Sequence, residues 1–276
     1  MPAIDLSRLR KQAARLTDFF FLPEEFLKHL HELLDYYVNR SLRQVEDVAP
    51  GSILSTYHTP SVVIRQIELE LGDMASENPS EALDLADLLW DQGYLEMHML
   101  AAFLLGRIPP LEAQGQRLLA RLTAWSAQVR DPNVRASLLS TSLARLRRET
   151  PGRFLQLIGE WLHPARTRTW SNGIQALLPL IADPDFQNLP AVLDLVEPVV
   201  EAAPALIQLD LEELIVALYK ASPEETSFFL RQVLTRSENP MTAITLRRIS
   251  SSFPVELQSD LRGLLRNPKN LSAKGG

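Results

Sequence analysis

Cysteine is absent from this 276-residue chain. Its absence excludes disulfide frameworks, thiolate zinc sites and thiol nucleophiles, and it is typical of a protein in a reducing compartment. Glycine is scarce, and the eleven glycines form no Gly-rich loop of the kind that holds nucleotide phosphates. The closest pair of the five histidines, His29 and His31, points to different faces of a helix. We therefore predict no cofactor and no metal site.

The chain also lacks a long apolar run, since spanning a bilayer needs about 20 consecutive apolar residues. The most apolar stretch, residues 189–219, is interrupted by six acidic residues. The first twenty residues mix basic and apolar side chains and do not have the pattern of a secretory signal peptide. These features predict a soluble, cytoplasmic protein with no membrane partner.

Alternation of apolar and polar residues, the signal of a β-strand, is nearly absent, whereas helical periodicity is clear. Apolar residues recur at spacings of three and four through residues 211–219, which places one apolar stripe on a helix. In the N-terminal part, the pattern predicts helices at residues 23–45, 60–77, 79–91 and 94–107. Residues 46–57 are predicted to form a loop around Pro50 and Gly51.

Prolines punctuate the C-terminal half at intervals of 13 to 20 residues. Proline is favoured in the first turn of a helix, and most of these prolines follow a residue that can cap a helix. Ser222, followed three residues later by Glu225, has the pattern of a capping box. Helices are therefore predicted to start at Pro132, Pro151, Pro164, Pro184, Pro204, Pro223, Pro240 and Pro254.

Two such helices make a unit of about 31 to 39 residues, near the period of HEAT and related helical repeats. The predicted fold is all-α, a HEAT-like α-solenoid (α-α superhelix) of stacked antiparallel helix pairs. A layered helix bundle is the alternative. We expect residues 1–56 to form an N-terminal helical cap, residues 57–266 the solenoid, and residues 267–276 a disordered tail.

Charge is distributed unevenly along the chain. The net charge is −6, but residues 130–168 contain eight arginines and three acidic residues, so this window carries +5 and the remainder −11. Such asymmetry indicates an anionic partner, and a solvated helix face is the alternative. The candidate nucleic-acid-binding residues are Arg130, Arg135, Arg145, Arg147, Arg148, Arg166 and Arg168.

Two tryptophans, Trp125 and Trp170, lie near these arginines, and an exposed indole there could stack on a base or sugar. Both are therefore candidate nucleic-acid-binding residues, with buried packing as the alternative. Three aspartates, Asp84, Asp87 and Asp91, share one helix face and could supply a general acid or base. An acidic outer face of a helical repeat has the same pattern.

Several segments together resemble the AlkD-type DNA alkylation-repair glycosylases. Residues 57–67 are similar to the family's proline-containing entry motif followed by an arginine, here Pro60 and Arg65. Residues 88–102 are similar to its Leu-Trp, acidic and Ala-rich helix junction, and residues 154–170 and 214–233 also fit. The resemblance covers residues 57–250 and implies a HEAT-like curved solenoid with a basic concave groove that binds DNA.

The resemblance also implies a chemistry, in which an aspartate and nearby tryptophans stabilise the positive charge on the sugar as an alkylated base departs. The aspartate position falls near Ala136 and its companion tryptophan near Pro132. A shift of register would bring Asp131 to the aspartate position, which makes Asp131 the best remaining candidate for the catalytic residue. The later tryptophan position falls near Glu213 or Leu214, and an arginine position near Gly173.

Three functions follow from these observations. The first is a DNA-binding member of this superfamily that contacts duplex DNA through the arginines of residues 130–168, with the catalytic residues not evident. The second is a non-enzymatic scaffold that binds a protein or peptide partner, because helical repeats present long binding surfaces. The third is an active glycosylase that uses Asp131.

Overall fold

The computed structural model of the chain describes residues 4–38, 52–110, 114–202, 204–237 and 239–253, with the separate positions 255, 258, 259, 261 and 263. The chain divides into two compact units, residues 1–154 and 155–276. Helices dominate both units, and within the described ranges the only β-type pairing is an isolated bridge between Ser55 and Tyr94. The prediction of an all-α fold is therefore confirmed.

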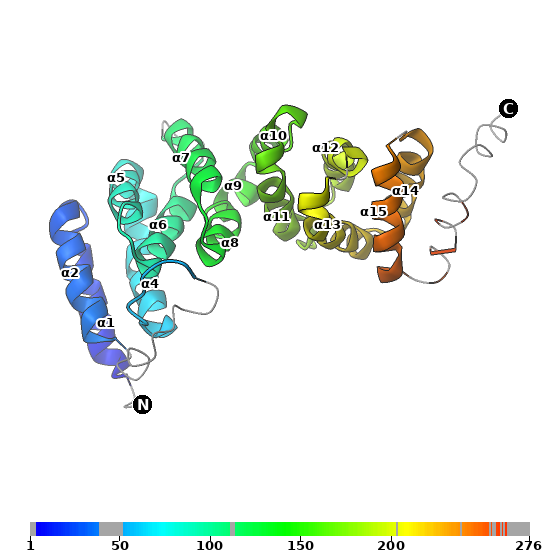
Figure 1. Cartoon of the computed structure of the whole chain (residues 1–276). Helices are drawn as coiled ribbons and strands as arrows, with labels where there is room; N and C mark the ends of the chain where they lie inside the picture. The colour runs from blue at the N-terminus through cyan, green and yellow to red at the C-terminus, as the bar shows by residue number, and fades with distance from the viewer. Residues whose placement is uncertain are drawn as a thin grey trace. The chain divides into compact units, whose positions relative to one another are not determined.

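The first unit is built from helices of 6 to 17 residues (Figure 1). They are α1 (Leu6–Thr17), α2 (Pro23–Tyr36), α4 (Ser61–Glu77), α5 (Pro79–Trp90), α6 (Leu95–Arg107), α7 (Gly115–Gln128), α8 (Pro132–Ser140) and α9 (Ala144–Glu149). The next helix, α10 (Pro151–Trp161), contains the boundary between the units.

Several helices in this unit pack on a neighbour in the chain and on the helix two positions further along. Helices α1, α4, α6 and α8 stack in that order, and α2 stacks on α5. The chain neighbours α4 and α5, α5 and α6, and α7 and α8 also pack together. This is the stacking that a helical repeat predicts, because each helix buries an apolar face against two partners.

The second unit repeats this pattern. Its helices are α11 (Trp170–Ile181), α12 (Leu189–Ala202), α13 (Gln208–Ala221), α14 (Pro223–Arg236) and α15 (Pro240–Ile249), with 3₁₀ turns η1 (Pro164–Thr169), η2 (Ala205–Ile207) and η3 (Ser250–Ser252). Helix α11 stacks on α13, α13 on α15, and α12 on α14. The stripe predicted for residues 211–219 is buried at Leu211, Leu214, Ile215 and Leu218.

Proline marks some helix starts correctly and others wrongly. Helices begin at Pro132, Pro151, Pro223 and Pro240, as predicted. The other three predicted starts that lie among the described residues do not begin an α-helix. Pro164 begins the 3₁₀ turn η1, Pro184 lies in a turn before Leu189 begins α12, and Pro204 precedes η2. Pro254 lies outside the described residues.

The capping residues show a similar split. Asp131 accepts from the backbone N–H groups of α8, and Asn239 accepts from that of Met241 in α15. The predicted capping box at Ser222 is wrong, because the Ser222 side chain makes no capping hydrogen bond. Its backbone carbonyl accepts from the N–H of Thr226 instead, so helix α14 begins without a side-chain cap.

The predicted N-terminal helices at residues 60–77, 79–91 and 94–107 correspond to α4, α5 and α6. The predicted helix at residues 23–45 is shorter, since α2 ends at Tyr36. Residues 39–51, and the predicted tail at 267–276, lie outside the described ranges. Helices α1 and α2, in the predicted cap, pack on α4 and α5. None of the described helices is long and apolar enough to cross a membrane.

Candidate nucleic-acid interface

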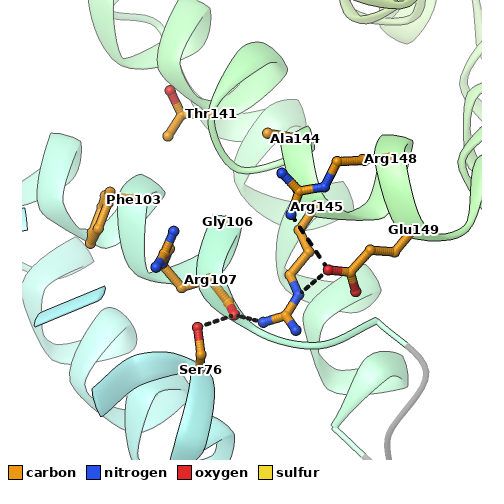
Figure 2. A pocket seen from close by; sticks show the side chains of 9 residues that line it. All are labelled: Ser76, Phe103, Gly106, Arg107, Thr141, Ala144, Arg145, Arg148 and Glu149. Atoms are coloured by element: carbon orange, nitrogen blue, oxygen red, sulfur yellow. Dashed lines mark hydrogen bonds and ion pairs between the residues drawn. The ribbon is translucent and has the colours of Figure 1, made fainter. Parts of the chain in front are cut away.

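Arginine side chains of the first unit gather where the C-terminal end of α6 meets α9. Arg107 is the last residue of α6, while Arg145 and Arg148 lie on α9. All three line a pocket of 340 Å³ (Figure 2). The remaining lining residues are Ser76, Phe103, Gly106, Thr141, Ala144 and Glu149, so the pocket holds three guanidinium groups and one carboxylate.

A hydrogen-bond network fixes one side of this pocket. The last carbonyls of a helix have no partner within the helix, and the carbonyl of Arg107 accepts from the guanidinium of Arg145 and, at 3.2 Å, from the hydroxyl of Ser76. Arg145 also donates through Nε to Glu149 at 2.8 Å. Arg145 therefore caps α6 and is held in place by Glu149.

The other two guanidinium groups are more open to solvent. The side chain of Arg148 is 79% exposed, and its Nη2 lies 3.6 Å from a Glu149 carboxylate oxygen. The side chain of Arg107 is 43% exposed; its Nε donates to the carbonyl of Gly72 at 3.2 Å, and its Nη2 lies 3.7 Å from a carboxylate oxygen of Asp73. Its guanidinium also lies 5.9 Å from the centre of the Phe103 ring, within cation–π range.

Gly106 explains how α6 and the α8–α9 link come this close. A Cβ atom at position 106 would lie 2.3 Å from the carbonyl oxygen of Thr141, well inside van der Waals contact. Only glycine permits this approach of the two backbones. The arginines of α6 and α9 share one pocket because the chain has no side chain at this contact.

The other sequence-predicted arginines lie elsewhere in the two units. In the first unit, Arg130 is exposed on the link before α8, while Arg135 on α8 and Arg147 on α9 are half-buried. In the second unit, Arg166 and Arg168 are both exposed on η1, a turn with no buried residue. The structure thus brings together only Arg145 and Arg148 of the predicted set, and adds Arg107.

A second polar cluster holds the segment 52–59 against the helices of the first unit. Buried Glu96, in the first turn of α6, accepts from the Thr56 hydroxyl at 2.8 Å and from the Tyr57 N–H at 3.2 Å. The Tyr57 hydroxyl is hydrogen-bonded to His31 of α2. Burial, and then the neighbouring Tyr94, raise the pKa of Tyr57, so its hydroxyl stays protonated.

Asp131 anchors the start of the same segment and is itself 2% exposed. One carboxylate oxygen accepts from the Ser52 hydroxyl at 2.6 Å and the Ile53 N–H at 2.8 Å. The other accepts from the N–H groups of Asn133 and Val134 at 2.9 and 3.1 Å. Burial acts to raise the pKa of Asp131, but the hydrogen bonds from Ser52 and these backbone N–H groups outweigh it and lower the pKa.

Comparison with known families gives a match over the greater part of the chain. The family described as DNA alkylation repair enzyme matches residues 58–250, which include both the arginine pocket and Asp131. The chain belongs to the DNA alkylation repair enzyme family. Comparison with curated proteins and with solved structures found no match.

Membership in the DNA alkylation repair enzyme family confirms the predicted resemblance and, with it, the HEAT-like α-α superhelix as the fold class. In this member, the candidate catalytic residue Asp131 is buried and its hydrogen bonds hold parts of the fold together. Both oxygens of Asp131 accept two hydrogen bonds each, and the side chain is almost fully buried. A carboxylate in this state caps α8 and tethers the segment 52–59.

The two candidate tryptophans of this DNA alkylation repair family member are buried. Trp125 is 7% exposed and stacks on Trp90, with ring centres 4.2 Å apart and planes within 2°. Trp170 is 3% exposed and donates its ring N–H to the carbonyl of His163 at 3.0 Å. Their burial agrees with the alternative interpretation of the sequence, in which both indoles pack in the interior. Neither presents an open ring face for a base.

Two of the three aspartates considered as a general acid or base, Asp84 and Asp87, form ion pairs between α5 and α7, whereas Asp91 follows the last residue of α5. Asp87 accepts from Nε of Arg121 at 2.7 Å and from a second nitrogen of the same guanidinium. Asp84 accepts from Arg117 at 2.9 Å. These pairs link side chains of α5 and α7, and they agree with the alternative of a charged outer face.

Proposed function

We propose that this member of the DNA alkylation repair enzyme family binds duplex DNA through contacts between its arginines and the backbone phosphates. The exposed arginines of both units carry this proposal, Arg130 and Arg148 in the first and Arg166 and Arg168 in the second. They stay exposed on a chain whose net charge is −6. Guanidinium groups bind phosphates through paired N–H donors, and such contacts carry no sequence information.

Charge reversal at the exposed arginines tests this proposal. We expect the variant R130E/R166E/R168E to lose most of its affinity for duplex DNA, because it replaces attraction to phosphate with repulsion. These residues were chosen over Arg145 because Arg145 caps α6, so its replacement would disturb the fold. Fluorescence anisotropy with a labelled duplex gives the readout.

The matched control is R130K/R166K/R168K, which keeps each positive charge and removes only the guanidinium. It should bind DNA more weakly than wild type but far more tightly than the glutamate variant, because a lysine still neutralises a phosphate but lacks the paired donors of a guanidinium. DNA binding by the glutamate variant as tight as that of wild type would contradict the proposal.

Base release from alkylated DNA is a separate question, and Asp131 is the residue that tests it. We propose that the protein binds DNA and that Asp131 does not act in base release, because four hydrogen bonds already occupy its carboxylate oxygens. A base-release assay on alkylated duplex, with wild type and Asp131→Asn, distinguishes the two. Release by wild type that is lost in a folded, DNA-binding Asp131→Asn variant would assign Asp131 a catalytic role.

A protein-binding scaffold is the alternative function, and exposed apolar residues of the second unit favour it. Leu206 in η2 is 98% exposed, and Leu209 and Phe228 are also exposed. Large exposed apolar side chains mark protein-binding surfaces when they form a patch. Absence of DNA binding at low salt, together with capture of a defined protein partner through these residues, would favour the scaffold.

A further inference from the structure

The arginine pocket between α6 and α9 brings three guanidinium groups together, one of them from outside the arginine-rich window. Arg107 lies 23 residues before the arginine-rich window and is brought to it by the fold. Its guanidinium shares the 340 Å³ pocket with those of Arg145 and Arg148. Like charges are placed together at an energetic cost, so three guanidinium groups around one pocket indicate an anionic occupant.

Two carboxylates lie close to the three guanidinium groups, Glu149 in the lining and Asp73 outside it, 3.7 Å from Nη2 of Arg107, so they leave one positive charge unbalanced. The Glu149 carboxylate is bound directly by Arg145 at 2.8 Å, whereas Arg148 lies 3.6 Å away, beyond a short charge-assisted hydrogen bond. Arg148 therefore has most of its five N–H donors free of acceptors among the described residues. The same holds for Nη2 of Arg145.

The size and lining of the pocket limit the kind of anion that fits. Its volume lies at the lower end of the range for small-molecule sites, about 300–1,000 Å³. The Ser76 hydroxyl already donates to backbone carbonyls, Thr141 adds one hydroxyl to the lining, and Phe103 is the one large apolar side chain of the lining. A tetrahedral anion with several acceptor oxygens matches the guanidinium donors, and the volume leaves room for the groups attached to it.

We infer that this pocket binds one phosphate of the DNA backbone, with Arg107 and Arg148 as the main donors and Glu149 as a built-in competitor. The inference rests on the proposed DNA-binding function and names the site of one of its phosphate contacts. The side chain of Arg148 is 79% exposed, so a phosphate that approaches from solvent can contact its guanidinium directly. Arg145, held by Glu149 and the carbonyl of Arg107, lines the wall of the pocket.

The test compares the salt dependence of duplex DNA binding among single variants. Each phosphate contact contributes about one to the slope of log affinity against log salt concentration. R148Q and R107Q should each bind several-fold more weakly at low salt and lower this slope by about 1. E149Q should bind more tightly than wild type, because it removes the carboxylate that competes for Arg148.

The matched control is R117Q, which loses one positive charge from α7 in the same unit, where Arg117 is paired with Asp84. It should leave the slope at the wild-type value. If R148Q and R107Q behave like R117Q while wild type binds DNA, the pocket inference is wrong and the proposed function stands. If wild type does not bind DNA at all, both fail.

Inorganic phosphate distinguishes a DNA phosphate from a free one. At constant ionic strength, added phosphate should compete weakly with DNA for wild type and not for R148Q. If phosphate instead raises the unfolding temperature of wild type but not of R148Q, while both proteins bind DNA with the same slope, the pocket is a free-phosphate site and the inference is overturned.

Discussion

Asp131 shows at the scale of one residue how this chain uses a buried charge. Its carboxylate joins two segments that lie about eighty residues apart, because it accepts from Ser52 and Ile53 as well as from the first turn of α8. A negative side chain at a helix N-terminus is also favoured by the helix dipole. The hydrogen bonds compensate for burial, and the lowered pKa of Asp131 is the direct result.

Replacing Asp131 by asparagine should therefore destabilise the fold. The amide NH₂ group would face donors instead of accepting from them, so we expect a loss of about 2 kcal/mol in the free energy of unfolding at neutral pH. Urea denaturation provides the measurement. The control is Asp183→Asn, an exposed aspartate that accepts one hydrogen bond from the N–H of Asp185, and it should cost less than about 0.5 kcal/mol.

The same substitution predicts a pH dependence. Because the pKa of Asp131 is lower in the folded than in the unfolded protein, the carboxylate contributes stability above its unfolded pKa of about 4. That contribution is lost as pH falls through the lower folded value. The stability difference between wild type and Asp131→Asn should thus narrow below about pH 4, and a difference that stays constant with pH would contradict the account.

At the scale of elements, the contact between α6 and the α8–α9 link depends on Gly106. We expect Gly106→Ala to destabilise the protein by about 1–3 kcal/mol, because the new methyl group would meet the carbonyl oxygen of Thr141 and force two backbones apart. Thermal or urea unfolding gives the measurement, and DNA affinity should fall as well since Gly106 lines the arginine pocket.

The matched control for this prediction is Gly152→Ala in the first turn of α10. An added Cβ there meets no atom within 4 Å. This variant should be as stable as wild type or up to about 1 kcal/mol more stable, since alanine restricts the unfolded chain. Equal effects of the two substitutions would show that the close α6 contact is not the cause.

Helix positions were largely predictable from the sequence where an apolar stripe is present. Helices α4, α5 and α6 begin and end within about a residue of prediction, although none has a side-chain cap and only α4 and α5 have a proline at their start, so the apolar stripe is the signal the three share. The helix starts predicted at Pro184 and Pro204 were wrong, because proline permits the start of a helix but does not require one. Pro179 and Pro198 even lie inside α11 and α12.

The candidate site was less predictable, because its decisive contacts join residues far apart in sequence. Charge clustering identified Arg145 and Arg148, since both lie in one window. Nothing in the sequence connects Arg107 to them, because that contact depends on the packing of α6 against α9. The burial of Trp125 likewise depends on Trp90, a partner 35 residues earlier in the chain.

At the scale of the whole molecule, the account depends on how an acidic protein binds an acidic polymer. Local fields decide such binding at physiological salt, since charges more than about 8–10 Å apart are largely screened. The exposed arginines of each unit can therefore attract phosphates despite the net charge of −6. The same screening implies that DNA affinity depends steeply on salt, because each phosphate contact releases counterions.

The most direct test of the central claim is the affinity of the wild-type protein for undamaged duplex DNA, measured by fluorescence anisotropy at about 50 mM and about 200 mM salt. The account predicts micromolar or tighter binding at the lower salt, independent of sequence, and a steep loss of affinity at the higher salt. An absence of binding at the lower salt, or an affinity that does not change with salt, would contradict it.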